Sequence, residues 1–118
     1  MRSKRVEVSL PWYIWEDSSK ECLIERLRDR FQVYLNHEDT DFPFEYLKEG
    51  DFVIDKESDI SINLLDLSQK RSKLSLTIEL SYTLKRLKKM EHGESLRSAW
   101  KTVRFEIDPD EGRVDVYV

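Results

Sequence analysis

The sequence predicts a single α+β domain in which one main N-terminal helix packs on a curved, antiparallel meander sheet of four to five strands. Two patterns carry this prediction. Apolar residues recur at helical spacing from Leu23 to Leu35, and apolar and polar residues alternate from Leu74 to Leu84. The first pattern is typical of an amphipathic helix, and the second of a strand with one buried face. The 118 residues suffice for one core, so we treat residues 1–118 as one domain.

The helix is expected at about residues 19–36. Ser18 and Glu21 have the spacing of a capping box, in which each side chain accepts a bond from a free backbone N–H of the first turn. Cys22 lies beside the apolar stripe, and free cysteines are among the most buried residue types, so we expect Cys22 to be buried and unreactive. The stripe itself consists of Leu23, Ile24, Leu27, Phe31, Tyr34 and Leu35.

The other elements follow from alternation and from turn residues. Residues 42–50 predict one short helical turn, with Pro43 near its start and Gly50 at its end. The run of Leu64, Leu65 and Leu67 breaks the alternation of its strand and predicts either a β-bulge or burial on both faces. Val118 shares the phase of the last strand and is expected to be ordered in it. The expected strands are 6–10, 60–64, 73–84, 102–107 and 114–118, with a hairpin turn at 108–112, and a further strand region begins at 52–54.

The composition favours a cytoplasmic protein. Cys22 is the single cysteine, which excludes an internal disulfide and suits a reducing compartment. No stretch of about 18 apolar residues is present, so we expect no membrane span. The basic residues near Met1 are not followed by an apolar stretch, which argues against a secretory signal.

Charge is distributed unevenly along a chain whose formal net charge is -4. Residues 38–66 contain ten acidic and two basic side chains, whereas residues 70–104 contain ten basic and three acidic ones. The two segments either face each other, solvate different faces, or form a two-sided partner surface. The basic residues from Lys85 to Arg104 raise the question of nucleic-acid binding. The negative net charge of the whole chain and the lack of a base-stacking motif argue against nucleic-acid binding. Lysines also protect sheet edges from aggregation, which is another explanation for these basic residues.

No motif of an enzyme or a metal site is evident. Cys22 with a histidine is the only thiol–imidazole pairing available, and Asp55, Glu57 and Asp59 only faintly resemble a calcium loop, without its glycine. We interpret those acids as a solvated turn. Glu79 is the best candidate for a catalytic acid, but its phase puts it on the wet face, where we expect a cross-strand salt bridge. We expect no metal and no cofactor.

Aromatic residues gather in the two segments that flank the helix. Aromatic side chains are enriched in cores and at interfaces, and seven of them are more than this small core readily buries. We therefore expect one or two to be exposed and ringed by acids, as anchors for a protein partner. The aromatic residues are Trp12, Tyr13, Trp15, Phe42, Phe44, Tyr46 and Phe52. The predicted partner-binding residues are Asp39, Asp41, Phe42, Phe44, Glu45 and Tyr46.

These observations favour a non-enzymatic protein-interaction domain that binds a basic partner. A small acidic inhibitor, an immunity-type protein or an adaptor would fit, and a homodimer through a sheet edge is a further option. The alternative is a small-molecule-binding or catalytic domain. The predicted layout resembles that of cystatin-like and NTF2-like cones, and this alternative places a pocket between the helix and the curved sheet.

Overall fold

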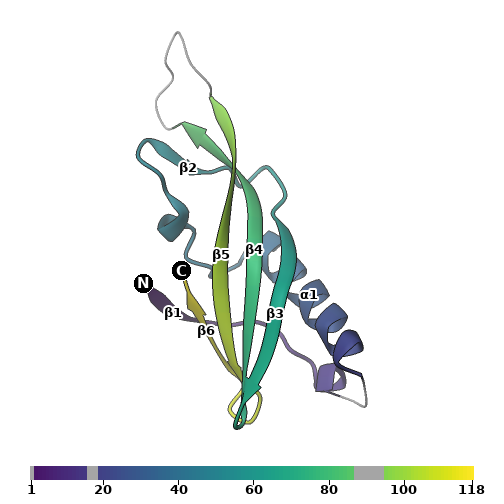
Figure 1. Ribbon diagram of the computed structural model, residues 1–118. Coiled ribbons are helices and arrows are strands. Elements are labelled where there is room, and N and C mark those ends of the chain that lie inside the picture. The colour runs from purple at the N-terminus through teal and green to yellow at the C-terminus, as the bar shows by residue number, and fades with distance from the viewer. Residues whose placement is uncertain (1, 16–18, 87–94) are drawn as a thin grey trace.

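The protein is one helix packed against a curled antiparallel sheet, which forms a half-barrel (Figure 1). A computed structural model describes residues 2–15, 19–86 and 95–118. The sheet has six strands rather than four or five, in the order β1-β6-β5-β4-β2, and β3 also pairs with β4. The strands are β1 (Ser3–Val6), β2 (Phe52–Ile54), β3 (Ser61–Lys70), β4 (Lys73–Arg86), β5 (Leu96–Asp108) and β6 (Arg113–Tyr117). The helix is α1 (Lys20–Asn36), and two short 3₁₀ turns are η1 (Trp12–Trp15) and η2 (Phe44–Leu47).

Helix α1 begins one residue later than predicted, and its cap is a different serine. Ser19 is the N-cap, and its hydroxyl accepts a hydrogen bond of 3.4 Å from the backbone N–H of Cys22. The capping box predicted for Ser18 lies outside the described residues. The predicted apolar stripe is confirmed, because Leu27 and Phe31 are fully buried. The stripe therefore holds the helix on the sheet.

The longest strand, β4, lies between β3 and β5 in the sheet. Its alternate residues from Leu74 to Leu84 are buried, as the period of two predicts. Leu76 lies opposite Phe105 on β5, and the ring of Phe105 is 4.5 Å from that of Phe31 on the helix. We call the sheet face that carries these residues the inner face and the opposite one the outer face.

Strand β3 is irregular where the sequence predicts it to be. The register of β3 on β4 shifts between Leu64 and Asp66, so Leu65 is the extra residue of a bulge. The start of β3 is held by two helix side chains, which the sequence analysis did not predict. The Gln32 amide binds backbone groups of Ile60 and Ile62, and the Asn36 carboxamide accepts from Ile60 N–H at 2.8 Å. These bonds occupy backbone groups at the start of the edge of β3 that faces away from β4.

The two ends of the chain lie side by side in the sheet (Figure 1). Strand β1 pairs with β6 and ends at Val6, so it begins and ends earlier than the predicted 6–10. Strand β6 ends at Tyr117, one residue before the Val118 that the sequence placed in it, although Val118 still exchanges backbone hydrogen bonds of 2.8 and 3.1 Å with Arg2. In the preceding hairpin turn the Asp108 carboxylate accepts hydrogen bonds from the backbone N–H groups of Asp110 and Glu111. Gly112 in the same turn has a φ of 66°. Both features match the turn that the sequence predicts.

Candidate interaction surface

Asp41, a predicted partner-binding residue, joins three parts of the fold. Its carboxylate accepts a 2.7 Å bond from the hydroxyl of Tyr34 on α1 and a 2.9 Å bond from the backbone N–H of Glu7. Its backbone carbonyl accepts a 2.9 Å bond from Lys4 on β1. Burial, together with the bond to Asp41, raises the pKa of the Tyr34 hydroxyl, so this tyrosine stays neutral. Asp41 therefore ties the helix, the first strand and the following loop together.

The aromatic residues of the predicted site turn mainly toward the protein. Phe42 is only 4% exposed, and its ring lies 5.1 Å from Phe44 and 6.2 Å from Phe105. Phe44 is half-buried, and so is Tyr46, whose ring lies under the guanidinium of Arg2 at 5.1 Å. These contacts make the aromatic half of the segment part of the packing around η2.

The acidic residues of the segment are arranged differently from its aromatic ones. Asp39 and Glu45 are exposed. Asp39 and Asp41 line one surface hollow of about 350 Å³, whereas Phe44 borders another hollow of about 190 Å³. The structure thus brings two of the six predicted residues together in one hollow, and it places Phe42 in the core. Partner binding through this segment stays a prediction.

The most exposed aromatic side chain on the sheet is one that the sequence analysis did not single out. Trp100 on β5 is 69% exposed. It lies opposite Ser81 of β4 on the outer face, and Ser81 in turn lies opposite Ser61 of β3. A signal for it was present: Val103, Phe105 and Ile107 set the buried phase of β5, so an even-numbered Trp100 in the same strand has the exposed phase. The predicted strand began at residue 102 and left it out.

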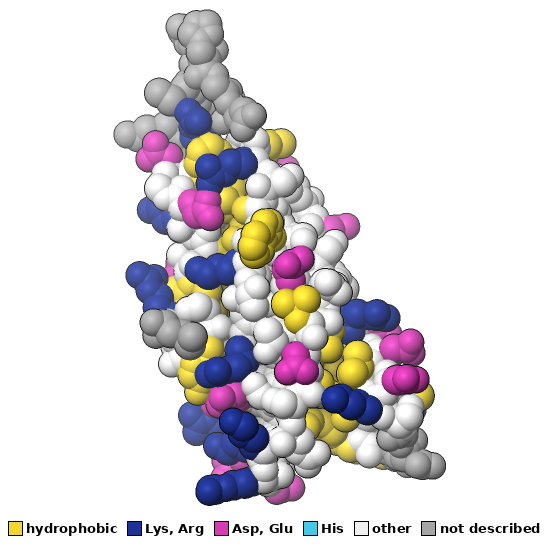
Figure 2. All heavy atoms as spheres, viewed as in Figure 1, with side chains coloured by type: hydrophobic (Ala, Val, Ile, Leu, Met, Phe, Trp, Pro, Cys, Tyr) yellow, Lys and Arg dark blue, Asp and Glu magenta, His cyan; other side chains and the backbone are white. Residues whose placement is uncertain are grey.

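The outer face around Trp100 is polar and carries carboxylates. Trp100 and Asp59 line one shallow hollow of about 360 Å³. Glu79 lies opposite Thr102, which is two residues from Trp100 on the same face, and this diagonal position is within reach of a large ring. The salt bridge expected for Glu79 does not form across the strands, because its partners there, Asn63 and Thr102, are uncharged. Figure 2 shows this face, on which separate hydrophobic side chains stand among polar ones.

In the described part of the chain, one ion pair joins the acidic segment to the basic one. Arg97 forms an ion pair with Glu49, and the guanidinium groups of Arg97 and Arg86 lie 4.6 and 5.0 Å from the ring of Phe52. Burial raises the pKa of the nearby Tyr82, and the charge of Glu49 adds to the rise. Part of the basic segment therefore stabilises the β2–β4 end of the fold. Two further basic residues of this segment, 88 and 89, lie outside the described residues.

The prediction for Cys22 is wrong, because this thiol is exposed. The reason is its angular position on the helix. Cys22 shares a helical face with Asp29 and Val33, which are also exposed, and the buried face carries Leu27 and Phe31. A short distance in sequence from Leu23 therefore did not imply burial.

The acids that faintly resemble a calcium loop form a turn with a buried member. Asp55 is 8% exposed, and its carboxylate accepts bonds from the backbone N–H of Glu57 at 3.1 Å and the hydroxyl of Ser58 at 2.9 Å. Asp55 thus stabilises the turn rather than being solvated. Among the residues that the structure describes, no group of three or more His, Cys, Asp or Glu side chains is arranged to hold a metal ion.

No known protein family, curated protein or solved structure matches this chain. Within the described ranges, the helix is neither long enough nor apolar enough to cross a membrane. The geometry of the chain's own surface is therefore the basis for assigning a function.

Proposed function

We propose that this protein is a non-enzymatic interaction domain that binds a basic protein partner through the outer face of its sheet, with Trp100 as the central anchor. The single observation that carries the proposal is the 69% exposure of Trp100 on an ordered strand. Tryptophan is enriched among the residues that dominate binding energy at interfaces. Since β5 is paired with β4 at Trp100, the strand presents the indole with little further loss of backbone entropy on binding.

The neighbours of Trp100 suit a large, flat contact. Ser81, Ser98 and Thr83 have short side chains and lie with Trp100 around the same shallow hollow. Short hydroxyl side chains leave the indole standing above the surface, where a partner can enclose it. They also offer donors and acceptors to the polar rim that interfaces usually have.

The charge around Trp100 supports a basic partner. Asp59 borders its hollow, Glu79 lies diagonally across the sheet, and Asp66 follows near the bulge of β3. Asp59 also borders the hollow that contains Phe44 and Glu38, so the Trp100 surface adjoins the acidic segment predicted from the sequence. Carboxylates around an apolar anchor raise the association rate of a cationic partner and disfavour an anionic one. In this proposal the exposed Asp39 and Glu45 add to that long-range attraction.

Packing between the helix and the sheet favours this proposal over the small-molecule alternative. Phe31, Leu76, Ile78 and Phe105 occupy the space between α1 and the inner face, and each is completely buried. The hollows discussed above are instead bordered mainly by exposed or half-buried residues on the surface. A cystatin-like or NTF2-like pocket needs an opening where this protein has close packing. An inhibitor, immunity-type protein or adaptor needs no such opening.

The test compares two exposed tryptophans. Tagged wild-type protein, Trp100→Ala and Trp12→Ala are used to capture proteins from the native host, and each captured protein is then purified and its Kd measured. Trp12 is a matched control because it is 71% exposed but lies in η1. We expect a partner whose Kd is raised about 30-fold or more by Trp100→Ala and little by Trp12→Ala.

The charge requirement has its own measurement. Glu79→Lys should slow association of that partner and weaken the salt dependence of the rate, with little change in dissociation. The proposal is wrong if no protein is captured, or if every captured protein binds Trp100→Ala as tightly as it binds the wild type. A captured partner whose affinity depends on Trp100 but whose association is indifferent to Glu79→Lys would contradict the basic-partner assignment.

A further inference from the structure

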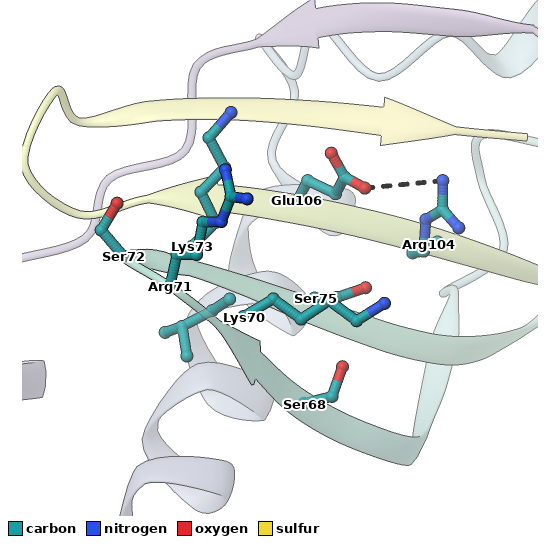
Figure 3. Close-up of a pocket in the computed structure, with 9 residues that line it drawn as sticks. Ser68, Lys70, Arg71, Ser72, Lys73, Ser75, Arg104 and Glu106 are labelled. Atoms are coloured by element: carbon teal, nitrogen blue, oxygen red, sulfur yellow. Dashed lines mark ion pairs between the residues drawn. The ribbon is translucent and has the colours of Figure 1, made fainter.

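The tip of the β3–β4 hairpin forms a hollow in which positive charge is concentrated. The hollow has a volume of about 480 Å³ and is bordered by four cationic side chains and one carboxylate, namely Lys70, Arg71, Lys73, Arg104 and Glu106. Figure 3 shows Arg71 and Lys73 close together at the tip, while Lys70 extends along the hollow toward Arg104. Three hydroxyl groups complete its polar lining, those of Ser68, Ser72 and Ser75.

Two features of this tip are locally unfavourable. Lys70 and Lys73 lie directly opposite each other in the hairpin, and like charges in that position repel. Arg71 follows with a φ of 57°, a left-handed conformation that glycine, asparagine and aspartate adopt far more readily. Within the described residues it is the only non-glycine with a positive φ. Strained residues cluster at binding sites, and an anion between the two lysines would relieve their repulsion.

The fourth cation, Arg104, is held in position by a residue of its own strand and by one of β6. The guanidinium of Arg104 lies 3.5 Å from the carboxylate of Glu106 and 4.7 Å from the ring of Tyr117 on β6. Its side chain is nevertheless 42% exposed, so it retains N–H groups that can reach a ligand. A donor that is already fixed loses less conformational entropy when it binds.

We propose that this hollow binds the phosphate group of a small phosphorylated molecule. Lys70 and Lys73 supply charge from both strands, Arg104 supplies a planar pair of N–H donors, and the serine hydroxyls complete the coordination of the oxygens. The volume of about 480 Å³ lies within the range of small-molecule sites. This site is separate from the Trp100 surface and does not depend on it.

The surroundings of the hollow favour a small ligand over nucleic acid or a membrane. Asp66 and Glu79 follow along the same outer face, and Asp108 and Asp115 border an adjoining hollow next to Lys73. An extended polyanion or an anionic lipid surface would meet these carboxylates. Figure 2 shows that the Lys and Arg side chains along this face have Asp and Glu side chains among them, so they do not form a continuous basic surface.

The experiment uses inorganic phosphate and pyrophosphate as probes, with sodium chloride at matched ionic strength. Amide chemical shifts of the whole chain are followed by NMR during each titration. We expect saturable shifts centred on Ser68, Ser72 and Ser75 that chloride does not reproduce. Lys70→Ser/Lys73→Ser should weaken binding about tenfold or more, whereas Lys48→Ser, an exposed lysine elsewhere, should leave it unchanged.

A second variant separates binding from folding. Arg71→Gly removes a cation and also relieves the left-handed backbone, so it should weaken phosphate binding severalfold while the melting temperature stays the same or rises. The proposal is overturned if chloride gives the same shifts, if no saturation occurs, or if the lysine variant binds phosphate as the wild type does. Tighter binding to DNA or to anionic phospholipid vesicles, compared at equal phosphate concentration, would overturn the assignment to a small molecule.

Discussion

The inner and outer faces of β4 and β5 carry side chains of different kinds. On the inner face large apolar residues meet the helix, as Leu76, Ile78 and Phe105 do, and none of the three is exposed. On the outer face short hydroxyl side chains surround the exposed Trp100. The inner face accounts for folding, because burial of apolar surface is the main stabilising term. The outer face contributes little to folding, which leaves its residues available for binding.

The largest effect is expected from the inner face. Phe105→Ala should lower the free energy of unfolding by about 3–5 kcal/mol, because it removes a buried ring that contacts Phe31 and Phe42 and leaves a cavity. Chemical denaturation measures this loss. Thr102→Ala, an exposed position on the same strand, is the control and should change stability by less than about 0.5 kcal/mol. Equal losses in both variants would contradict the division between the two faces.

A smaller loss is expected at the C-terminal edge of the inner face. Val116 is completely buried and lies opposite Lys4 of β1 on one side and Phe105 of β5 on the other. Val118 forms backbone hydrogen bonds with Arg2. Removing residues 116–118 should cost about 2–3 kcal/mol and lower the melting temperature by several degrees. An unchanged melting temperature in the truncated protein would show that β1 and β6 contribute little to the fold.

A third effect concerns the bond between the helix and the loop after it. Tyr34→Phe removes the hydroxyl that binds Asp41 and should cost about 1 kcal/mol. Burial and Asp41 raise the pKa of Tyr34 above its ordinary value of 10.0, so its stabilising contribution is present below about pH 10 and is lost at higher pH, where the unfolded tyrosine ionises. Denaturation curves of both proteins from pH 8 to 11 should therefore converge at the alkaline end. Tyr13→Phe, at an exposed ring, should leave the curves unchanged.

Residues that contact the core through their own element were predictable from the sequence. The period of two placed Leu74 to Leu84 on the inner face, and the period near 3.6 placed Leu27 and Phe31 on the helix stripe. The error at Cys22 arose because proximity along the chain was used in place of its angle around the helix axis.

Features made by distant segments were not predictable in the same way. The bonds from Gln32 and Asn36 to the start of β3 join residues more than 20 positions apart, and no local pattern encodes them. Asp41 looked like a free surface acid because its partners, Tyr34 and Glu7, are brought to it by tertiary packing. Trp100 is the exception, since its exposed phase can be read from β5 once the strand is extended to Leu96.

The smallest effect on stability is expected at Trp100, and it sharpens the comparison with Phe105. Both are large aromatic residues on β5, at positions of opposite phase. Because Trp100 is 69% exposed, Trp100→Ala removes few packing contacts and should change the free energy of unfolding by no more than about 0.5 kcal/mol. The same variant should lower partner affinity about 30-fold. Its effect on binding should therefore be much larger than its effect on stability. Denaturation and binding are measured on one preparation of the variant. A loss of stability comparable to that of Phe105→Ala would show that Trp100 is a structural residue. That result would contradict the assignment of the outer face as the binding surface.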